Sequence, residues 1–351
     1  EQRARVSAIG PLQLSYNPAS RRRHILTTVH SNTNPLALIA DDMREVDRVI
    51  ARCLTTSVPL IGQISQYIIA AGGKRLRPAL LLMVARSLGC EDARRFDLAT
   101  VVELIHTATL LHDDVVDEST LRRGRPTANE SFGNPASVLV GDFLHTRSFQ
   151  MMVAAGNMRI LQVLSDATNI IAEGEVQQLI NTHDASLSEA GYLHVIRSKT
   201  AKLFEASAQI AAILSGATPE QEAASVTYGQ ALGTAFQIID DVLDYDGDAA
   251  EMGKNLGDDL REGKCTLPLI IAMQRGAPAQ SAVVREAIEQ GSTDKLTEIL
   301  AIVRATGALD ATRQAAHDEA MRAMQALDAL PSNAHTDAMR QLASQLLLRR
   351  T

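Results

Sequence analysis

The chain has 351 residues, enough for one large domain or two ordinary ones, and its formal net charge of −7 argues against a nucleic-acid-binding surface. Of its residues 46% are hydrophobic but only 3% are aromatic, and no uninterrupted apolar run reaches the roughly 18 residues of a membrane span. The three cysteines, Cys53, Cys90 and Cys265, show no CxxC pair and no metal-ligand spacing. We therefore expect a cytoplasmic protein with free thiols, no nucleic-acid partner and no integral membrane span.

Residues 1–34 are polar, contain Pro11 and Pro18 and show no hydrophobic periodicity, so we expect a flexible N-terminal arm. No apolar segment of the kind found in signal peptides follows its Arg21-Arg22-Arg23-His24 cluster. Two interpretations of this cluster stay open: a solvated arm, or a transient contact with an anionic membrane surface.

From about residue 36 onward the hydrophobic pattern is helical, because Ala, Leu, Ile and Val occur in runs longer than strands need. No stretch alternates as a strand would, and no linker separates two domains. The sequence therefore predicts a single all-α domain over residues 35–351. Glycine and proline breaks delimit helices at 36–54, 58–71, 78–88, 93–117, 135–155, 157–182, 188–214, 219–247, 266–274, 280–290, 293–304, 307–329 and 333–349.

An acidic cluster, Asp113-Asp114-Val115-Val116-Asp117, closes the helix predicted at 93–117. At about 100° per residue, Asp113 and Asp117 fall on one face, and His106 points the same way. Carboxylates stacked one turn apart repel each other and weaken a helix by a few tenths of a kcal/mol, so a cation has to compensate. A solvated helix end and a metal site both fit this motif alone.

The same spacing recurs at Asp240, Asp241 and Asp244, again after an apolar helical run. Two acidic helix ends that follow buried helices can face each other across a cavity. Six carboxylates gathered there require a divalent metal, and an all-oxygen ligand set suits Mg²⁺, which also takes substrate phosphates as ligands.

Two basic stretches lie in loops between predicted helices. In Gly72–Pro78 two glycines free the backbone, and Lys74 and Arg77 precede a helix whose N-terminal dipole favours an anion. This fits a diphosphate-binding loop or a glycine-terminated helix followed by solvated charges. In Leu121–Pro126 the adjacent arginines Arg122 and Arg123 can form internal salt bridges or hold phosphate oxygens.

Two further basic stretches follow later in the chain. Ser198-Lys199-Thr200 interrupts an otherwise apolar helix, where a Lys–Thr pair needs an anionic partner or a solvated cavity. Gly253–Lys264 is a polar, glycine-spaced loop shortly after the second acidic motif. Together with the acidic clusters these stretches predict an enzyme that binds one or two diphosphates with apolar tails. The absence of GxxxxGK[ST], GxSxG and HExxH argues against nucleotide hydrolysis, serine hydrolysis and zinc proteolysis.

The ordered set of motifs resembles the trans-isoprenyl diphosphate synthases, most closely their bacterial long-chain members of the octaprenyl type, over residues 36–351. One departure is Cys265, where the family pattern usually has Pro. The matching stretches are GGKRLRP (72–78), ELIHTATLLHDDVVDESTLRRGRPTAN (103–129), SVLVGDFLHTRSFQMM (137–152), EGEVQQL (173–179), SKTAKLFEASAQ (198–209), LGTAFQIIDDVLDY (232–245) and GKNLGDDLREGKCTLPL (253–269).

The resemblance implies the isoprenoid synthase fold, antiparallel helices around a deep central cavity, and a homodimer. It implies roughly three Mg²⁺ ions per active site. The implied metal ligands are Asp113, Asp117 and Asp240, with Asp114, Asp241, Asp244 and Lys199 as further catalytic residues. The implied allylic diphosphate site is Arg122, Lys199, Thr200, Gln237 and Lys254, and the implied isopentenyl diphosphate site is Lys74, Arg77, His106 and Arg123.

The implied reaction condenses an allylic diphosphate, farnesyl diphosphate, with successive isopentenyl diphosphates. Ala108 and Thr109 are small where short-chain relatives carry bulky aromatics, so we expect a long all-trans product of octaprenyl length, made for a quinone side chain such as that of ubiquinone. The floor of the product tunnel then lies deeper, at Leu104 or Ile105, or at Phe149 and Met152; ordinary core packing accounts for these side chains equally well. A class I terpene cyclase and a non-catalytic subunit of a heteromeric prenyl synthase are the alternatives.

Overall fold

The computed structural model describes residues 34–246 and 256–349 and distinguishes two compact units, Glu1–Asn34 and Pro35–Thr351. Only the second unit is described below. The predicted arm and Lys254 therefore lie outside the described residues. None of the described helices has both the length and the apolar character needed to cross a bilayer.

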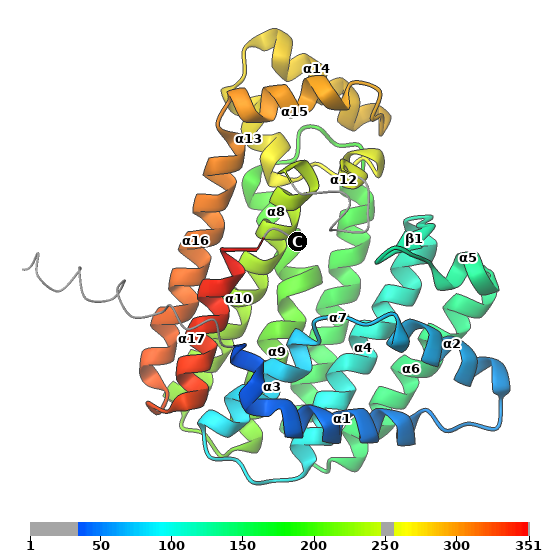
Figure 1. Cartoon of the computed structure of the whole chain (residues 1–351), viewed down its shortest axis with the longest axis vertical. Coiled ribbons are helices and arrows are strands. Elements are labelled where there is room, and N and C mark those ends of the chain that lie inside the picture. Colours follow the sequence, from blue (N-terminus) through cyan, green and yellow to red (C-terminus); the bar gives the residue numbers. More distant parts are fainter. Residues whose placement is uncertain (1–33, 247–255, 350–351) are drawn as a thin grey trace, which may run out of the picture. The chain divides into compact units, whose positions relative to one another are not determined.

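The described part of the second unit is almost entirely helical, so the all-α prediction is confirmed (Figure 1). Proline starts several helices within their first two positions, and the side chains of Asn157, Ser188 and Asn333 cap others. The helices are η2 (Pro35–Ile39), α1 (Ala40–Cys53), α2 (Pro59–Ala70), α3 (Leu76–Ser87), α4 (Arg94–Val116), α5 (Ala128–Phe132), α6 (Asn134–Ala154), α7 (Met158–Asn181), α8 (Glu189–Ile196), η3 (Arg197–Ala201), α9 (Lys202–Leu214), α10 (Pro219–Asp246), α12 (Asp258–Arg261), α13 (Leu267–Arg275), α14 (Pro278–Gln290), α15 (Leu296–Ala305), α16 (Ala308–Ala326), η4 (Leu327–Ala329) and α17 (Ala334–Leu346).

A minimal β-hairpin, β1 (Leu121–Arg122) and β2 (Arg125–Pro126), departs from the all-helical expectation. Its turn residues Arg123 and Gly124 both have positive φ, 52° and 72°, as a type I′ turn requires. Strands of two residues are too short to show alternation, which explains why the sequence pattern gave no sign of them.

A second departure concerns the helix predicted at 188–214. The structure divides it into α8, a π-helical turn η3 and α9. Arg197 and Ala201, the first and last residues of the turn, have right-handed helical dihedral angles, and the apolar helical pattern resumes directly after the turn. Hydrophobic periodicity alone therefore does not reveal the extra residue that widens the turn.

Helix α10 lies at the centre of the bundle and packs against α9 on one side and α16 on another, while α7 packs on α9 and α4 on α6 (Figure 1). The largest buried side chains of α10, Tyr228 and Tyr245, have no exposed surface. A main apolar core surrounds this helix. A separate small cluster fills the space between α2, α4 and α6, and includes Ile64, Ala108 and Leu144.

Candidate active site

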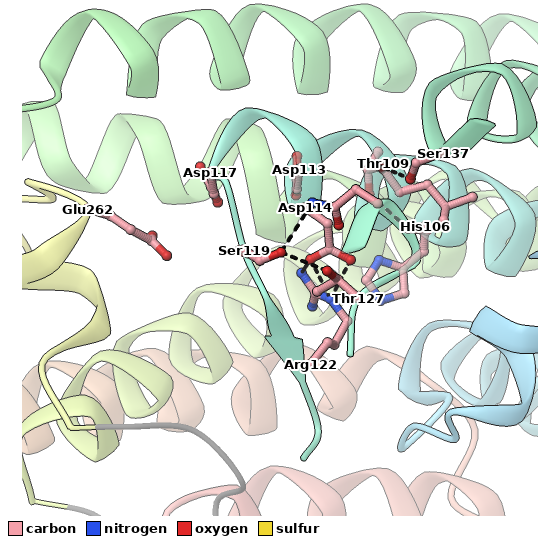
Figure 2. A network of polar contacts seen from close by, with 12 residues as sticks. His106, Thr109, Asp113, Asp114, Asp117, Ser119, Arg122, Thr127, Ser137 and Glu262 are labelled. Carbon is pink, nitrogen blue, oxygen red and sulfur yellow. Dashed lines mark hydrogen bonds and ion pairs between the residues drawn. The ribbon is translucent and has the colours of Figure 1, made fainter. Parts of the chain in front are cut away.

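The first aspartate-rich motif ends α4, and its three aspartates divide between two faces. Figure 2 shows Asp113 and Asp117 projecting to one side of the helix and Asp114 to the other. Asp114 is fully buried, and Arg122 donates to its Oδ1 from Nε at 2.9 Å and from Nη2 at 2.7 Å. The helical spacing thus leaves Asp113 and Asp117 on a shared face and commits Asp114 to an internal ion pair.

Lys199, from the π-helical turn, faces the first motif together with a glutamate of α7. Its Nζ lies 2.5 Å from Oε2 of Glu175 and 3.8 Å from Oδ2 of Asp113. Burial raises the pKa of Glu175 to about 7, against the attraction of Lys199, and also raises the pKa of Asp113. Glu175 is not among the predicted site residues, although the EGEVQQL stretch contains it.

Lys264 supplies the second cation on the exposed face of this motif. Its Nζ lies 3.1 Å from Oδ2 of Asp117 and also contacts the carboxylate of Glu262, which Figure 2 shows across from Asp117. Burial opposes the charge of this ammonium group, but the carboxylates of Glu262, Asp117 and Asp259 outweigh burial and raise its pKa. Asp113 and Asp117 therefore each share a lysine with a glutamate.

In the second motif, Asp240 is the aspartate whose side chain reaches solvent. It is 32% exposed and lies 2.8 Å from Nη1 of Arg349 near the carboxyl end of the chain. The Arg349 guanidinium also lies 4.6 Å from the ring centroid of Phe236, one turn before Asp240. An arginine remote in sequence thus occupies the face of Asp240 that the resemblance assigns to metal.

The other two aspartates of the second motif are buried and hydrogen-bonded within the protein. Asp241 accepts from the Tyr192 hydroxyl at 2.5 Å and from Gln237 Nε2 at 2.8 Å. Burial, followed by repulsion from Asp259, raises the pKa of Asp241 to about 8. Asp244 has no exposed surface and accepts from the Asp259 amide at 3.3 Å. Both carboxyl groups fix the local structure.

A cavity of about 130 Å³ lies between the second motif and the π-helical turn. Thr200 Oγ1 donates to Gln237 Oε1 at 2.9 Å, so these two predicted residues meet at its wall. The polar side of the cavity is lined by Lys199, Thr200, Gln237, Asp241 and Lys264, and its apolar side by Leu187, Val195 and Ile196.

The four residues predicted to bind isopentenyl diphosphate also come together. Arg77 Nη1 lies 3.1 Å from His106 Nε2, and the guanidinium stacks 4.5 Å from the ring centroid of Phe204. The Arg123 guanidinium packs so closely over Gly73 that an added Cβ there would lie 2.8 Å from Nη1. The glycine is thus required by the close approach of the hairpin to the loop before α3.

The charges of this basic cluster repel one another. Burial, and then the cations Arg77, Arg122 and Arg123, hold the pKa of His106 well below its usual value, so its imidazole is neutral at pH 7. Burial lowers the pKa of Arg77 to about 10 and also lowers that of Lys74, to which Arg349 adds repulsion. An anion bound among these side chains would relieve this repulsion.

The donor set fits Mg²⁺, since the exposed face of each motif offers carboxylate oxygens. Across residues 34–246 and 256–349, no three acidic, histidine or cysteine side chains converge on one point. Instead, each exposed carboxylate faces a cation. The partially exposed aspartates are Asp113, Asp117 and Asp240, at 19%, 23% and 32%, whereas Asp114, Asp241 and Asp244 are at most 2% exposed.

The polyprenyl synthetase family model matches residues 58–303. The chain belongs to the polyprenyl synthetase family. It is 54% identical over 284 residues to octaprenyl diphosphate synthase of Escherichia coli K12, covering 81% of this chain and 88% of that protein. It is 54% identical over 282 residues to the octaprenyl diphosphate synthase of Haemophilus influenzae, covering 80% and 86%. The predicted family is therefore confirmed.

Solved structures agree with this assignment. A polyprenyl synthase from Caulobacter crescentus, complexed with calcium and isoprenyl diphosphate, superposes with a TM-score of 0.88 at 43% identity, covering 91% of this chain and 98% of that one. A decaprenyl diphosphate synthase from Rhodobacter capsulatus gives 0.86 at 45% identity, covering 90% and 98%. The chain has the isoprenoid synthase fold and is a prenyl transferase that elongates prenyl diphosphates.

Several polar residues of the site have no counterpart among the predicted site residues. Glu175, Glu262 and Lys264 lie within stretches that carried the family resemblance, so their positions were signalled but not their contacts. Tyr192 and Arg349 had no signal, since each belongs to a helix or segment without a motif and acquires its partner only through packing.

Proposed function

We propose that this polyprenyl synthetase family member condenses farnesyl diphosphate with successive isopentenyl diphosphates to make an all-trans octaprenyl diphosphate for a quinone side chain. The observation that carries the proposal is the pairing of two unlike sites. One has carboxylates with lysines around the cavity, and the other is a basic cluster of Lys74, Arg77, His106 and Arg123. Identity of 54% to two octaprenyl diphosphate synthases supports the product length.

The allylic diphosphate belongs between the two aspartate motifs. Asp113, Asp117 and Asp240 would hold Mg²⁺, three ions by family resemblance, and bound Mg²⁺ would neutralise charge on the leaving diphosphate. Lys199 and Thr200 lie beside these carboxylates. When the diphosphate binds, the Lys199 ammonium group can exchange its ion pair with Glu175 for an ion pair with the phosphate oxygens. As the allylic C–O bond breaks, the diphosphate takes both electrons and these cations stabilise its growing charge.

Isopentenyl diphosphate belongs in the basic cluster. There Lys74, Arg77 and Arg123 bind the diphosphate, and neutral His106 donates a hydrogen bond. The double bond of isopentenyl diphosphate attacks the allylic cation, a C–C bond forms, and the proton released from the adjacent carbon goes to the departed diphosphate. No side chain needs to act as a nucleophile, and the apolar wall keeps water from the cation.

Arg122 has a double role in this proposal. Its Nε and Nη2 are engaged by buried Asp114, which fixes the plane of the guanidinium. Nη1 makes no contact with Asp114 in this arrangement and is available to the allylic diphosphate. Asp114 acts through Arg122 and is a positioning residue.

The growing tail follows α4 away from Asp113, past Thr109 and Ala108. The Thr109 hydroxyl donates to the His106 carbonyl at 2.9 Å, so its methyl group is the part left to face a hydrocarbon. Ala108 lies 1% exposed in the small apolar cluster with Ile64 and Leu144. Small side chains at both positions favour a long product.

A second copy of the chain is proposed to cover the outer faces of α6 and α7. These helices are joined by a short turn and expose large apolar side chains that a monomer would leave in water. The exposed residues are Leu139 and Val153 on α6, and Met158, Val176, Leu179 and Ile180 on α7, at 58–77%. Sedimentation should give twice the monomer mass; a monomer would contradict the proposed dimer.

The cytoplasmic location of the protein stays a prediction.

Incubating the protein with Mg²⁺, farnesyl diphosphate and labelled isopentenyl diphosphate tests the reaction. We expect octaprenol after phosphatase treatment and chromatography. A cyclic hydrocarbon would indicate a terpene cyclase. Lack of incorporation by protein shown to be folded would indicate a non-catalytic subunit, and a single product of another length would contradict the octaprenyl assignment.

A further inference from the structure

The π-helical turn η3 interrupts what would otherwise be one helix from Glu189 to Leu214. Such turns make up well under 1% of residues in globular proteins and occur often at functional sites. This one contains Lys199 and Thr200, which both line the cavity.

Two consecutive side chains of the turn line the cavity and contact different neighbouring helices. In the π-helical turn Lys199 reaches Glu175 on α7, while Thr200 hydrogen-bonds to Gln237 on α10. The turn therefore presents an ammonium and a hydroxyl to the same space.

Two glycines of neighbouring helices press directly on this turn. A Cβ at Gly174 of α7 would lie 2.9 Å from the backbone nitrogen of Lys199 and 2.9 Å from Cβ of Ser198. A Cβ at Gly233 of α10 would lie 2.7 Å from Cα of Ala201. All three distances are too short for a real methyl group, and two of the three contacted atoms belong to the backbone of the turn.

Neither glycine is needed for its own backbone conformation. Gly174 and Gly233 lie inside long helices and are not among the glycines with positive φ. Glycine inside a helix is unfavourable relative to alanine, so these positions lower helix stability although their backbone conformation does not need glycine. What they provide is room for the turn.

We propose that Gly174 and Gly233 are positioning residues that hold the π-helical turn from two sides and so aim Lys199 and Thr200 at the allylic diphosphate. The inference rests on the proposed role of Lys199 and Thr200. A methyl group at either glycine displaces the backbone of the turn, and a misplacement of about 1 Å can cost roughly 100-fold in rate. The basic cluster that binds isopentenyl diphosphate does not contact Gly174, so Gly174→Ala leaves its geometry unchanged. A Cβ at Gly233 would also lie 3.1 Å from Cβ of Phe204, the residue whose ring stacks on Arg77, so Gly233→Ala can disturb this cluster too.

The test compares Gly174→Ala and Gly233→Ala with two controls. Gly62→Ala makes the same change within α2 where nothing lies within 4 Å, and Val303→Ala removes buried side-chain volume in α15, away from the turn. Val303→Ala provides a destabilised enzyme with an unaltered turn. Circular dichroism and thermal melts establish that each variant is folded before kinetics are measured.

We expect kcat to fall at least tenfold in Gly174→Ala and Gly233→Ala, with a raised KM for farnesyl diphosphate in both. The KM for isopentenyl diphosphate should stay unchanged in Gly174→Ala, the variant whose added methyl group contacts only the turn. Affinity for a non-ionising thio analogue of farnesyl diphosphate, measured by calorimetry with Mg²⁺, should fall as well. Ser198→Gly added to Gly174→Ala removes one of the contacts and should restore part of kcat. Both controls should keep wild-type kcat.

The proposal is overturned if both glycine variants fold and keep wild-type kinetic constants, or if the two KM values rise together in Gly174→Ala. It is also overturned if neither variant folds, because the glycines would then serve the fold and not the turn. An inactive wild-type enzyme would contradict the proposed function itself, so the two failures are distinguishable.

Discussion

The two aspartate-rich motifs have the same spacing but different surroundings. At the end of α4, two aspartates are partly exposed and face Lys199 and Lys264, and one is buried against Arg122. At the end of α10, one aspartate is partly exposed and faces Arg349, and two are buried. The first motif therefore offers two carboxylates to a ligand and the second offers one.

The difference follows from where each helix lies. Helix α10 is central, with neighbours on several sides, so helical rotation turns Asp241 and Asp244 into the protein. Helix α4 ends at Val116, and Asp117 lies just beyond its last turn, where its side chain stays 23% exposed beside Lys264. One sequence pattern can thus hold metal with different numbers of carboxylates, according to how much of its helix is covered.

The largest expected effect is a loss of kcat on substituting one of the partly exposed aspartates. Asp113→Asn removes a carboxylate charge from the proposed metal site, and we expect kcat to fall roughly 10³-fold, because such preorganised electrostatic groups typically contribute this much. The unfolding free energy should change little, since Asp113 is partly exposed. Steady-state kinetics with saturating Mg²⁺ check this; a kcat within tenfold of wild type would contradict it.

Asp114→Asn, in contrast, should mainly lower the unfolding free energy. It removes one partner of an ion pair whose carboxylate is fully buried, which typically costs about 3 kcal/mol of unfolding free energy. Because Arg122 loses its anchor, KM for farnesyl diphosphate should also rise. Urea denaturation gives the free energy, with Asp166→Asn, an exposed aspartate on α7, as the control. Unchanged stability would mean that the pair is not structural.

Glu175 should make stability depend on pH. Burial raises its folded pKa from 4.5 to about 7, so between these values the unfolded chain has lost a proton that the folded chain retains. The unfolding free energy should therefore fall as pH rises from 4.5 to 7, by at most about 1.4 kcal/mol per pH unit. Glu175→Gln should make this fall shallower when both proteins are unfolded in EDTA across this range. Asp241, whose pKa is raised to about 8, contributes to the fall that remains. Parallel curves for the two proteins would contradict it.

The smallest effect on rate concerns the helices before the motifs. Four residues before Asp240, α10 carries Phe236, whereas α4 carries Thr109 and, next to it, Ala108. Ala108→Tyr gives α4 an aromatic there, and we expect products of farnesyl to geranylgeranyl length with the first condensation changed by less than about tenfold. Chromatography of the extracted prenols checks this. Ala301→Tyr, at an exposed position of α15, is the control. Unchanged product length would contradict the tunnel path.

Local chemistry made much of the fold predictable. Apolar periodicity with glycine and proline breaks located the long helices to within a few residues, because those signals act within one or two turns. The rotation of α4 likewise placed Asp113 and Asp117 on one face.

Features that depend on contacts distant in sequence were not predictable in this way. The π-helical turn packs closely against Gly174 and Gly233, which belong to two other helices. The burial of Asp241 depends on Tyr192, and the position of Arg349 on the docking of the carboxyl end near α10. Each requires the packed structure, since no local pattern encodes a partner many residues away.

Three of the six aspartates are proposed to bind metal and three to have structural roles. Calorimetry of the Mg²⁺-dependent binding of the thio analogue of farnesyl diphosphate tests this assignment most directly. The measurement compares single Asp→Asn variants at all six positions. The account predicts that metal-dependent binding is lost in the variants of Asp113, Asp117 and Asp240. It predicts that folded variants of Asp241 and Asp244 retain this binding, and that a folded variant of Asp114 retains it with lower affinity because Arg122 loses its anchor. Equal loss in both groups would contradict it.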